Sequence, residues 1–302
     1  MGIPQGSVIS PLLFNILLHN LPDSVSNKAQ IVQYADDIAM WMNVSLKRKT
    51  SLFEIKHITK LYQQDLDAIS NFIKCSGLEL SQDKTSMMLF NNGQNPRHLP
   101  TLVVDGQVLQ YSTEIKFLGV YLTPKLNWKK HFDYILHKAT KSLNLLKVVS
   151  KQHWGQDTKM LIHLALSLVR SKLSYGQEAF FSAPRSYLQK LLSLDSKAIK
   201  LALGVPVHTK TIEAYNMAGI VCLDQWRKLS CANYLVRSLA IDNHTREELF
   251  LRSDVHFPRR SRKIASLQTV ATYTHDLFHD SSINPADVSK KHTSLEKTNS
   301  RI

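Results

Sequence analysis

The residues best suited to chemistry are two adjacent carboxylates, Asp36 and Asp37. With Ala35 they join two short apolar runs, Gln30–Tyr34 and Ile38–Met42, a pattern that predicts a tight β-hairpin. Two like charges on a turn repel each other unless a cation neutralises them. Mg²⁺ binds through one or two protein carboxylates together with substrate phosphates. The pair therefore predicts a divalent-cation site, although aspartate is also common in ordinary solvated turns.

A second unusual string precedes the hairpin and reads Gly2-Ile3-Pro4-Gln5-Gly6-Ser7. It leads into an apolar run that starts at Ser10-Pro11 and ends at Pro22, which predicts a helix with proline in its first turn. Taken alone, the string fits a flexible loop in which glycine supplies unusual backbone dihedrals.

The elements around these strings have the pattern of a mixed α/β domain. Apolar residues recur at helical spacing from Leu52 to Ile73 and predict a long amphipathic helix that closes near Gly77. The dipeptide Asp105-Gly106 predicts a hairpin turn. Strands are expected at Ser86–Phe90, at Leu102–Val104 and Gln107–Leu109 on either side of that turn, and at Phe117–Leu122, where Pro124 ends the run.

Beyond Pro124 the pattern becomes helical, so we expect a domain boundary there. The first helix after the boundary, from Phe132 to Leu146, is accompanied by the lysines Lys129, Lys130, Lys138, Lys141, Lys147 and Lys151. Further helices are predicted at Met160–Leu173, Tyr187–Leu203 and Leu223–Leu239. A basic segment begins at Pro258, and the polar end of the chain predicts disorder.

The overall charge favours a polyanionic partner. The 302 residues carry 38 Lys and Arg against 24 Asp and Glu, a net charge of +14. No basic amphipathic membrane anchor is apparent, so nucleic acid is favoured, although solvated lysine faces would give the same charge. No signal peptide is recognisable, and the longest apolar stretch, Met160–Val169, is too short to span a bilayer. Three scattered cysteines favour a reducing, intracellular setting.

Taken together, the two strings resemble two consecutive motifs of reverse transcriptases. Gly2 to Phe14 is similar to motif B of that family, and Tyr34-Ala35-Asp36-Asp37 is similar to motif C, in the expected order. The resemblance continues, more weakly, through the later motifs of LINE-type (non-LTR, Jockey- or CR1-like) retrotransposon enzymes. The segments that carry it are Gly77–Thr85 (motif D), Phe117–Leu122 (motif E, the primer grip), Ala198–Pro206 (a turn after the thumb) and Trp226–Leu235.

The resemblance implies roles for individual positions. Asp36 would be the principal metal-binding aspartate and Asp37 a weaker one, with Mg²⁺ or Mn²⁺ as the metal. Lys84 matches the lysine of motif D and would donate a proton to pyrophosphate, with a solvated lysine beside a turn as the alternative. The family's substrate contacts would fall on Pro4, Gln5 and Gly6 (incoming nucleotide and template), Tyr34 and Ala35 (primer terminus), and Leu118 and Gly119 (primer backbone).

The implied architecture is an α+β partial palm of a right-hand polymerase, followed by an all-helical thumb and C-terminal region. We expect the palm over residues 1–123, the helical thumb and post-thumb region over 124–256, and a basic, disordered tail over 257–302. The implied partners are an RNA template, a DNA primer and deoxynucleoside triphosphates, in the nucleus or cytoplasm. The thumb lysines would track a phosphate backbone without reading its sequence.

The chain departs from the family pattern at its start. Only Met1 precedes Gly2, so the motif A aspartate and the fingers have no counterpart, and we expect the chain alone to incorporate no nucleotide. Two functions therefore stay open: a fragment of an RNA-directed DNA polymerase, or an inactive retroelement remnant that is at most a basic nucleic-acid-binding protein. The widely spaced His131, His137, His153 and His163 fit surface or core positions better than metal ligands, and Trp128 and Trp154 fit core or hinge positions.

Overall fold

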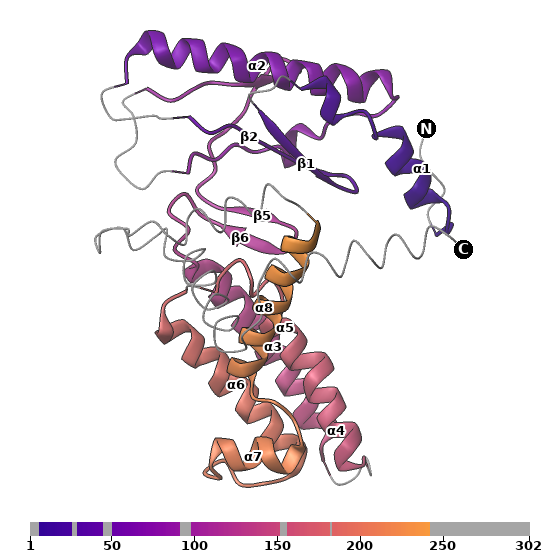
Figure 1. Cartoon of the computed structure of the whole chain (residues 1–302), viewed down its shortest axis with the longest axis vertical. Helices are drawn as coiled ribbons and strands as arrows, with labels where there is room; N and C mark the ends of the chain where they lie inside the picture. The colour runs from indigo at the N-terminus through magenta and orange to yellow at the C-terminus, as the bar shows by residue number, and fades with distance from the viewer. Residues whose placement is uncertain are drawn as a thin grey trace. The chain divides into compact units, whose positions relative to one another are not determined.

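The computed structural model describes residues 6–25, 29–44, 50–90, 98–151, 156–181 and 183–241 (Figure 1). The chain divides into two compact units, Met1–Asn127 and Trp128–Ile302, which are described one at a time. Pro4, Gln5, His153, Trp154 and the predicted tail over 257–302 lie outside the described residues.

The first unit opens with α1 (Ser10–Leu17), which has proline in its first turn as predicted. The helix ends earlier than the apolar run indicated, because turns and the short η1 helix (Pro22–Ser24) follow it. Only Leu18 and Leu21, beyond its last residue, are buried in this region. The apolar run therefore reflects burial after the helix as much as helical periodicity.

The predicted hairpin and long helix are confirmed. Strands β1 (Gln30–Tyr34) and β2 (Asp37–Trp41) pair antiparallel, and α2 (Leu52–Cys75) follows them. A capping box at Ser51 and Glu54 starts α2, since each side chain accepts a hydrogen bond from the backbone of the other residue. Figure 1 shows α2 lying alongside the β1–β2 hairpin, against which it packs.

The second hairpin is also confirmed, with β3 (Val103–Val104) and β4 (Gln107–Val108) joined by Asp105-Gly106. Both turn residues have positive φ, 49° and 83°, as this type of tight turn requires. The side-chain amide of Gln63 on α2 bonds both the N–H and the C=O of Val103, as a neighbouring strand would. Lys74 and Ser70, also on α2, bond the Asp105 carboxylate and hold its pKa below the usual value.

Two strand predictions are wrong. Ser86–Phe90 forms only an isolated bridge, from Met87 to Tyr111, because no partner strand continues beside it in the described residues. Phe117–Leu122 is not one strand but a hairpin, β5 (Ile115–Phe117) and β6 (Val120–Leu122). The chain reverses at Leu118-Gly119, whose φ values of 46° and 80° break any continuous strand.

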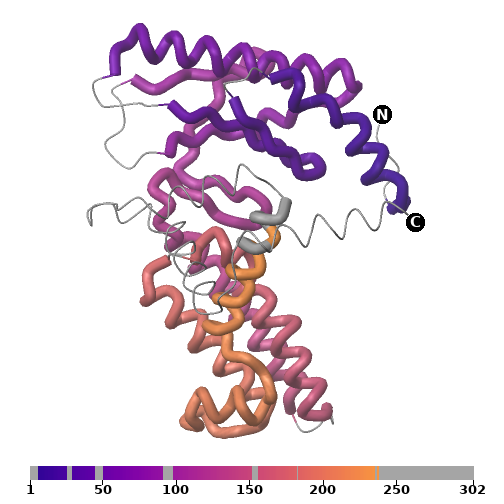
Figure 2. Tube along the Cα trace, viewed as in Figure 1, coloured from indigo at the N-terminus to yellow at the C-terminus, as the bar shows by residue number. Residues whose placement is uncertain are grey.

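The described part of the second unit is helical and continues from magenta to orange along the trace (Figure 2). The predicted basic helix is α3 (Lys129–Val149), and the later predictions correspond to α6 (Arg185–Leu203) and α8 (Leu223–Ile241). The helix predicted at Met160–Leu173 is α4 (Thr158–Leu164), a π-helical segment (Ala165–Arg170) and α5 (Ser171–Ser174) in succession. The sequence reasoning missed α7 (Thr211–Ala218).

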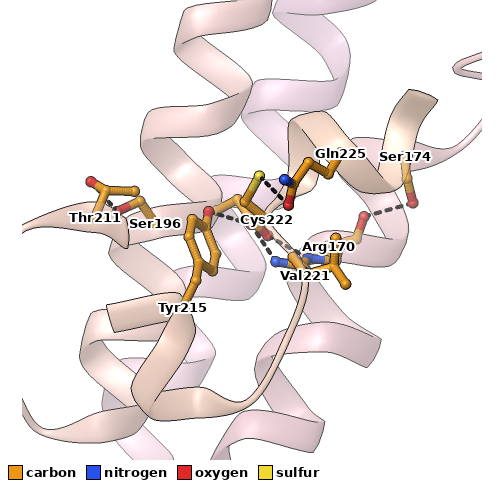
Figure 3. Close-up of polar contacts among 9 residues, drawn as sticks. Arg170, Ser174, Ser196, Thr211, Tyr215, Val221, Cys222 and Gln225 are labelled. Carbon is orange, nitrogen blue, oxygen red and sulfur yellow. Dashed lines mark hydrogen bonds and ion pairs between the residues drawn. The ribbon is translucent and has the colours of Figure 1, made fainter. Parts of the chain in front are cut away.

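A buried ion pair ties these helices together. Arg170, at the end of the π-helical segment, donates two hydrogen bonds to Asp195 of α6 at 3.0 and 2.7 Å. Tyr215 of α7 donates to the same carboxylate at 2.7 Å, and Arg170 also reaches the carbonyl of Val221 (Figure 3). Burial and the neighbouring carboxylate raise the pKa of Tyr215, so this hydroxyl remains a donor.

An aromatic cluster surrounds a histidine at the start of α3. His131 is fully buried, 5.2 Å from the ring of Phe180 and 6.2 Å from that of Trp128 between centroids. Burial lowers the pKa of His131 to about 4. The histidine therefore lies in the core, and Trp128 packs beside it, as the sequence analysis preferred.

The ion pair gives a prediction for stability. Replacing Arg170 by Met leaves a buried carboxylate without its cation, which should lower the free energy of unfolding by about 3–5 kcal/mol. Asp195→Asn should also destabilise the unit, and the double variant should cost less than the sum of the two single changes. Chemical denaturation followed by circular dichroism measures this. Glu213→Gln, which breaks an exposed pair with Lys210, should cost under about 1 kcal/mol.

The buried histidine predicts a pH dependence. Between pH 6.5 and about 4 the unfolded chain binds a proton at His131 that the folded chain does not, so stability should fall as the pH is lowered. The maximum slope is about 1.4 kcal/mol per pH unit. His131→Phe should make the free energy of unfolding less dependent on pH between pH 6.5 and about 4. His163→Gln, at an exposed histidine, should leave the pH dependence unchanged. An unchanged slope in His131→Phe would contradict the assignment.

Candidate active site

The hairpin places the two aspartates in different backbone environments. Tyr34 pairs with Asp37, so the two-residue turn consists of Ala35 and Asp36, and Asp37 is the first residue of β2. Ala35 has a φ of 51°, a left-handed conformation that costs a residue with a Cβ roughly 1–2 kcal/mol. All four residues are exposed. The turn therefore presents adjacent carboxylates to solvent on a strained backbone.

Strand alternation divides the hairpin into two faces. Ile31, Ile38 and Met40 share one face and pack against Leu21, Ile69 and Ile73. Asp37 belongs to the opposite face, which also carries Val32, Tyr34 and Trp41 with exposed fractions of 44%, 64% and 40%. The sequence analysis did not single out this apolar face, although the alternating pattern on both strands contained the signal.

Helix α2 holds the hairpin from its buried side. The hydroxyl of Tyr62 donates to the carbonyl of Met40 at 2.9 Å, and burial raises the pKa of this tyrosine to about 12. Leu78 and Leu80, which follow α2, pack into the same apolar cluster as the hairpin. The segment predicted as motif D is therefore anchored beside the core face of the hairpin.

Lys84 ends the short η2 helix (Gln82–Lys84), four residues after Leu80. Its side chain is exposed and makes no ion pair with Asp36 or Asp37. Lys84, the motif D lysine, therefore follows the anchored segment closely in the chain but makes no ion pair with the two carboxylates.

The remaining predicted contacts lie on other elements. Gly6 has a φ of 92°, which only glycine adopts easily, and leads toward α1. Leu118 and Gly119 form the turn of the β5–β6 hairpin. That pair was predicted to lie within a strand, and it instead forms the tip of a hairpin.

The donor set of the first hairpin fits a hard divalent cation, because both groups are carboxylates and both are accessible. No cluster of three or more His, Cys, Asp or Glu side chains that could hold a metal occurs among the described residues. Asp36 and Asp37 would therefore need further oxygen ligands, which substrate phosphates and water supply in many magnesium sites.

Comparison with known proteins decides what this hairpin belongs to. Residues 1–122 match the family model described as reverse transcriptase (RNA-dependent DNA polymerase). This match covers nearly all of the first unit. The matched range contains Asp36, Asp37, Lys84 and the Leu118-Gly119 turn, so the resemblance seen in the sequence is confirmed at the level of the family.

Curated proteins that are similar to this chain come from non-LTR retrotransposons. The RNA-directed DNA polymerase from mobile element jockey of Drosophila funebris is 27% identical over 70% of this chain and 22% of its own length. Its Drosophila melanogaster counterpart is 24% identical over the same shares of both chains. The Pol polyprotein from the type-1 element R1 of Bradysia coprophila is 24% identical over 64% of this chain and 18% of its own length.

This chain thus spans about a fifth of the length of these reverse transcriptase relatives. The jockey match over 218 residues is longer than the first unit, so the similarity extends into the helical unit. No solved structure matches the chain. Among the described residues, no helix combines the length and apolar character that crossing a membrane requires.

The strained turn gives a prediction for the β1–β2 hairpin. Ala35→Gly should leave it as stable or stabilise it by up to about 1 kcal/mol, because glycine adopts positive φ without steric cost. Ala35→Val should destabilise it by more than about 1 kcal/mol, since β-branched residues fit that conformation poorly. Hydrogen exchange of the β1 and β2 amides measures both changes. Ala39→Val, within β2, is the control and should be tolerated.

Proposed function

We propose that the chain is part of an RNA-directed DNA polymerase that copies a retrotransposon RNA. The observation that carries the proposal is the β1–β2 hairpin, which presents two accessible carboxylates inside a domain that matches reverse transcriptases. Reverse transcriptases use divalent metal ions, so Asp36 and Asp37 would hold Mg²⁺ or Mn²⁺.

In this proposal Asp36 is the principal ligand, because its position in the turn leaves the carboxylate free of strand neighbours. Asp37, at the start of β2, would be the second ligand. The bound metal would polarise the phosphate under attack and stabilise the leaving oxygen. The chain's own contribution is to fix two carboxylates at one tip, with Tyr34 and Ala35 next to the primer terminus.

The other assignments complete the substrate site. Pro4, Gln5 and Gly6 would contact the incoming nucleotide and the template, and Leu118 and Gly119 would contact the primer backbone. Lys84 is exposed, as a proton donor to pyrophosphate must be. Gly6, Leu118 and Gly119 all have positive φ, which places them in turns rather than in regular helix or strand.

We assign the helical unit the role of a thumb and post-thumb region. Helix α3 exposes Lys129, Lys130, Lys138 and Lys141 while burying its apolar face. Exposed lysines spaced along a helix can follow phosphates and release counterions, which gives salt-dependent affinity. An RNA template paired with a DNA primer would be the ligand.

Metal binding tests the proposal directly. Paramagnetic Mn²⁺ added to the purified chain should broaden the amide NMR signals of residues 34–38 before others, because broadening falls steeply with distance from the ion. Asp36→Asn should abolish this effect by removing a ligand charge. Adding a primer–template and a deoxynucleoside triphosphate should tighten Mn²⁺ binding to the unaltered chain and not to the variant.

Asp23→Asn supplies the matched control, since it removes an exposed carboxylate of the same unit outside the hairpin. It should leave the broadening at residues 34–38 intact. Broadening that centres on another region, or that survives Asp36→Asn, would show that the hairpin is not a metal site and would remove the basis of the proposal.

A further inference from the structure

The solvent face of α6 has an unusual composition. Its exposed side chains, here called the α6 surface, are Arg185, Ser186, Gln189, Lys190, Ser193 and Lys197. From Ser186 onward they recur every three or four residues and so form one stripe along the helix. Every member of the α6 surface carries a hydrogen-bond donor, and none is apolar or acidic.

The single acidic residue of α6 points the other way. Asp195 is buried and bonded to Arg170 and Tyr215, so it cannot offset the positive charges on the outer face. A solvated helix face ordinarily interleaves both signs. Neighbouring elements do so, with ion pairs between Lys210 and Glu213 and between Lys228 and Asp224.

The cations of the α6 surface have no such partners. In the part of the chain that the structure describes, no carboxylate pairs with Arg185, Lys190 or Lys197. The Lys190 ammonium lies 5.8 Å from the ring centre of Tyr187, which leaves its N–H groups available to another acceptor. Three cations and three neutral polar residues therefore share one face without a carboxylate.

The first turn of α6 adds a further preference for an anion. The N-cap, Pro184, has no side-chain acceptor for the N–H groups of this turn, and the N–H of Tyr187 donates to the Pro184 carbonyl instead. The positive end of the helix dipole disfavours a cation there, yet Arg185 occupies the first position. A bound phosphate would be stabilised by the helix dipole and by the guanidinium together.

The distribution of charge along the chain points the same way. Residues 1–127 contain 11 Lys and Arg and 10 Asp and Glu, whereas residues 128–302 contain 27 and 14. Almost all of the net charge of +14 therefore belongs to the unit that contains α6. A positive field of this kind attracts a polyanion before any contact is made.

We propose that the α6 surface binds the phosphate backbone of a nucleic acid strand, as a site additional to the lysines of α3. From Arg185 to Lys197 the stripe is about 18 Å long at the ~1.5 Å rise per residue of a helix, enough for several consecutive phosphates. The absence of apolar groups on the α6 surface disfavours a protein partner, whose interface core is apolar. Recognition would be independent of sequence, and the proposal rests on the nucleic-acid function proposed above.

The test compares two triple variants of the full chain that lose the same charge. Arg185→Gln/Lys190→Gln/Lys197→Gln removes the cations of the α6 surface. Lys56→Gln/Lys60→Gln/Lys125→Gln removes three exposed lysines of the first unit. Binding to dye-labelled 20-nucleotide oligouridine RNA and oligothymidine DNA is followed by anisotropy from 50 to 200 mM salt. Thermal melting checks that both variants fold.

The α6 variant should bind RNA about tenfold more weakly at 50 mM salt. The slope of log affinity against log salt concentration should also be smaller in magnitude by about 2, because three phosphate contacts are lost and each releases roughly 0.7 counterion on a single strand. The matched control should lose less than about twofold. An equal loss for RNA and DNA would assign the shared backbone as the ligand, and a loss for RNA alone would assign RNA; both support the site.

Two outcomes would overturn the proposal. One is equal weakening in both triple variants, which would show a general charge effect. The other is a loss of binding to phosphatidylglycerol vesicles with RNA and DNA binding unchanged, which would assign the α6 surface to membranes.

Mn²⁺ binding at residues 34–38 should stay intact in the α6 variant. Failure of the α6 proposal is therefore distinct from failure of the polymerase proposal.

Discussion

Packing between α2 and one face of the β1–β2 hairpin is the contact on which the candidate active site depends. A two-stranded hairpin is at best marginally stable in water, so it needs an apolar support. Ile31, Ile38 and Met40 supply one side of that contact, and Ile69 and Ile73 supply the other. Because strand side chains alternate, burying this face turns Tyr34 and Asp37 outward. The accessible carboxylates are therefore a consequence of core packing.

In the helical unit, too, buried contacts determine which side chains are exposed. The Arg170–Asp195 pair and the Tyr215 hydroxyl fix α6 against its neighbours with a buried polar network. Such a network is costly to break, so it specifies which face of α6 is inside. Because Asp195 lies in the interior, the exposed face of α6 carries only cationic and neutral polar side chains. A structural ion pair thereby determines the electrostatic character of the α6 surface.

Several elements followed from local sequence signals. The Asp105-Gly106 turn and the apolar periodicity of α2 and α3 each depend on residues close in the chain, and the structure agrees. The errors came where partners are distant. Ser86–Phe90 has strand composition but no continuing partner among the described residues, and Leu118 takes a positive φ that its residue type does not suggest.

For the candidate site, the sequence by itself indicated the family: Asp36-Asp37 after Tyr34-Ala35, preceded by the Pro-Gln-Gly string, resembles the reverse transcriptases that residues 1–122 match. Only the tertiary structure decided that Asp36 lies in the turn while Asp37 starts a strand, and that Asp195 faces inward. Those outcomes depend on register and on contacts between residues far apart in the chain, which local patterns do not encode.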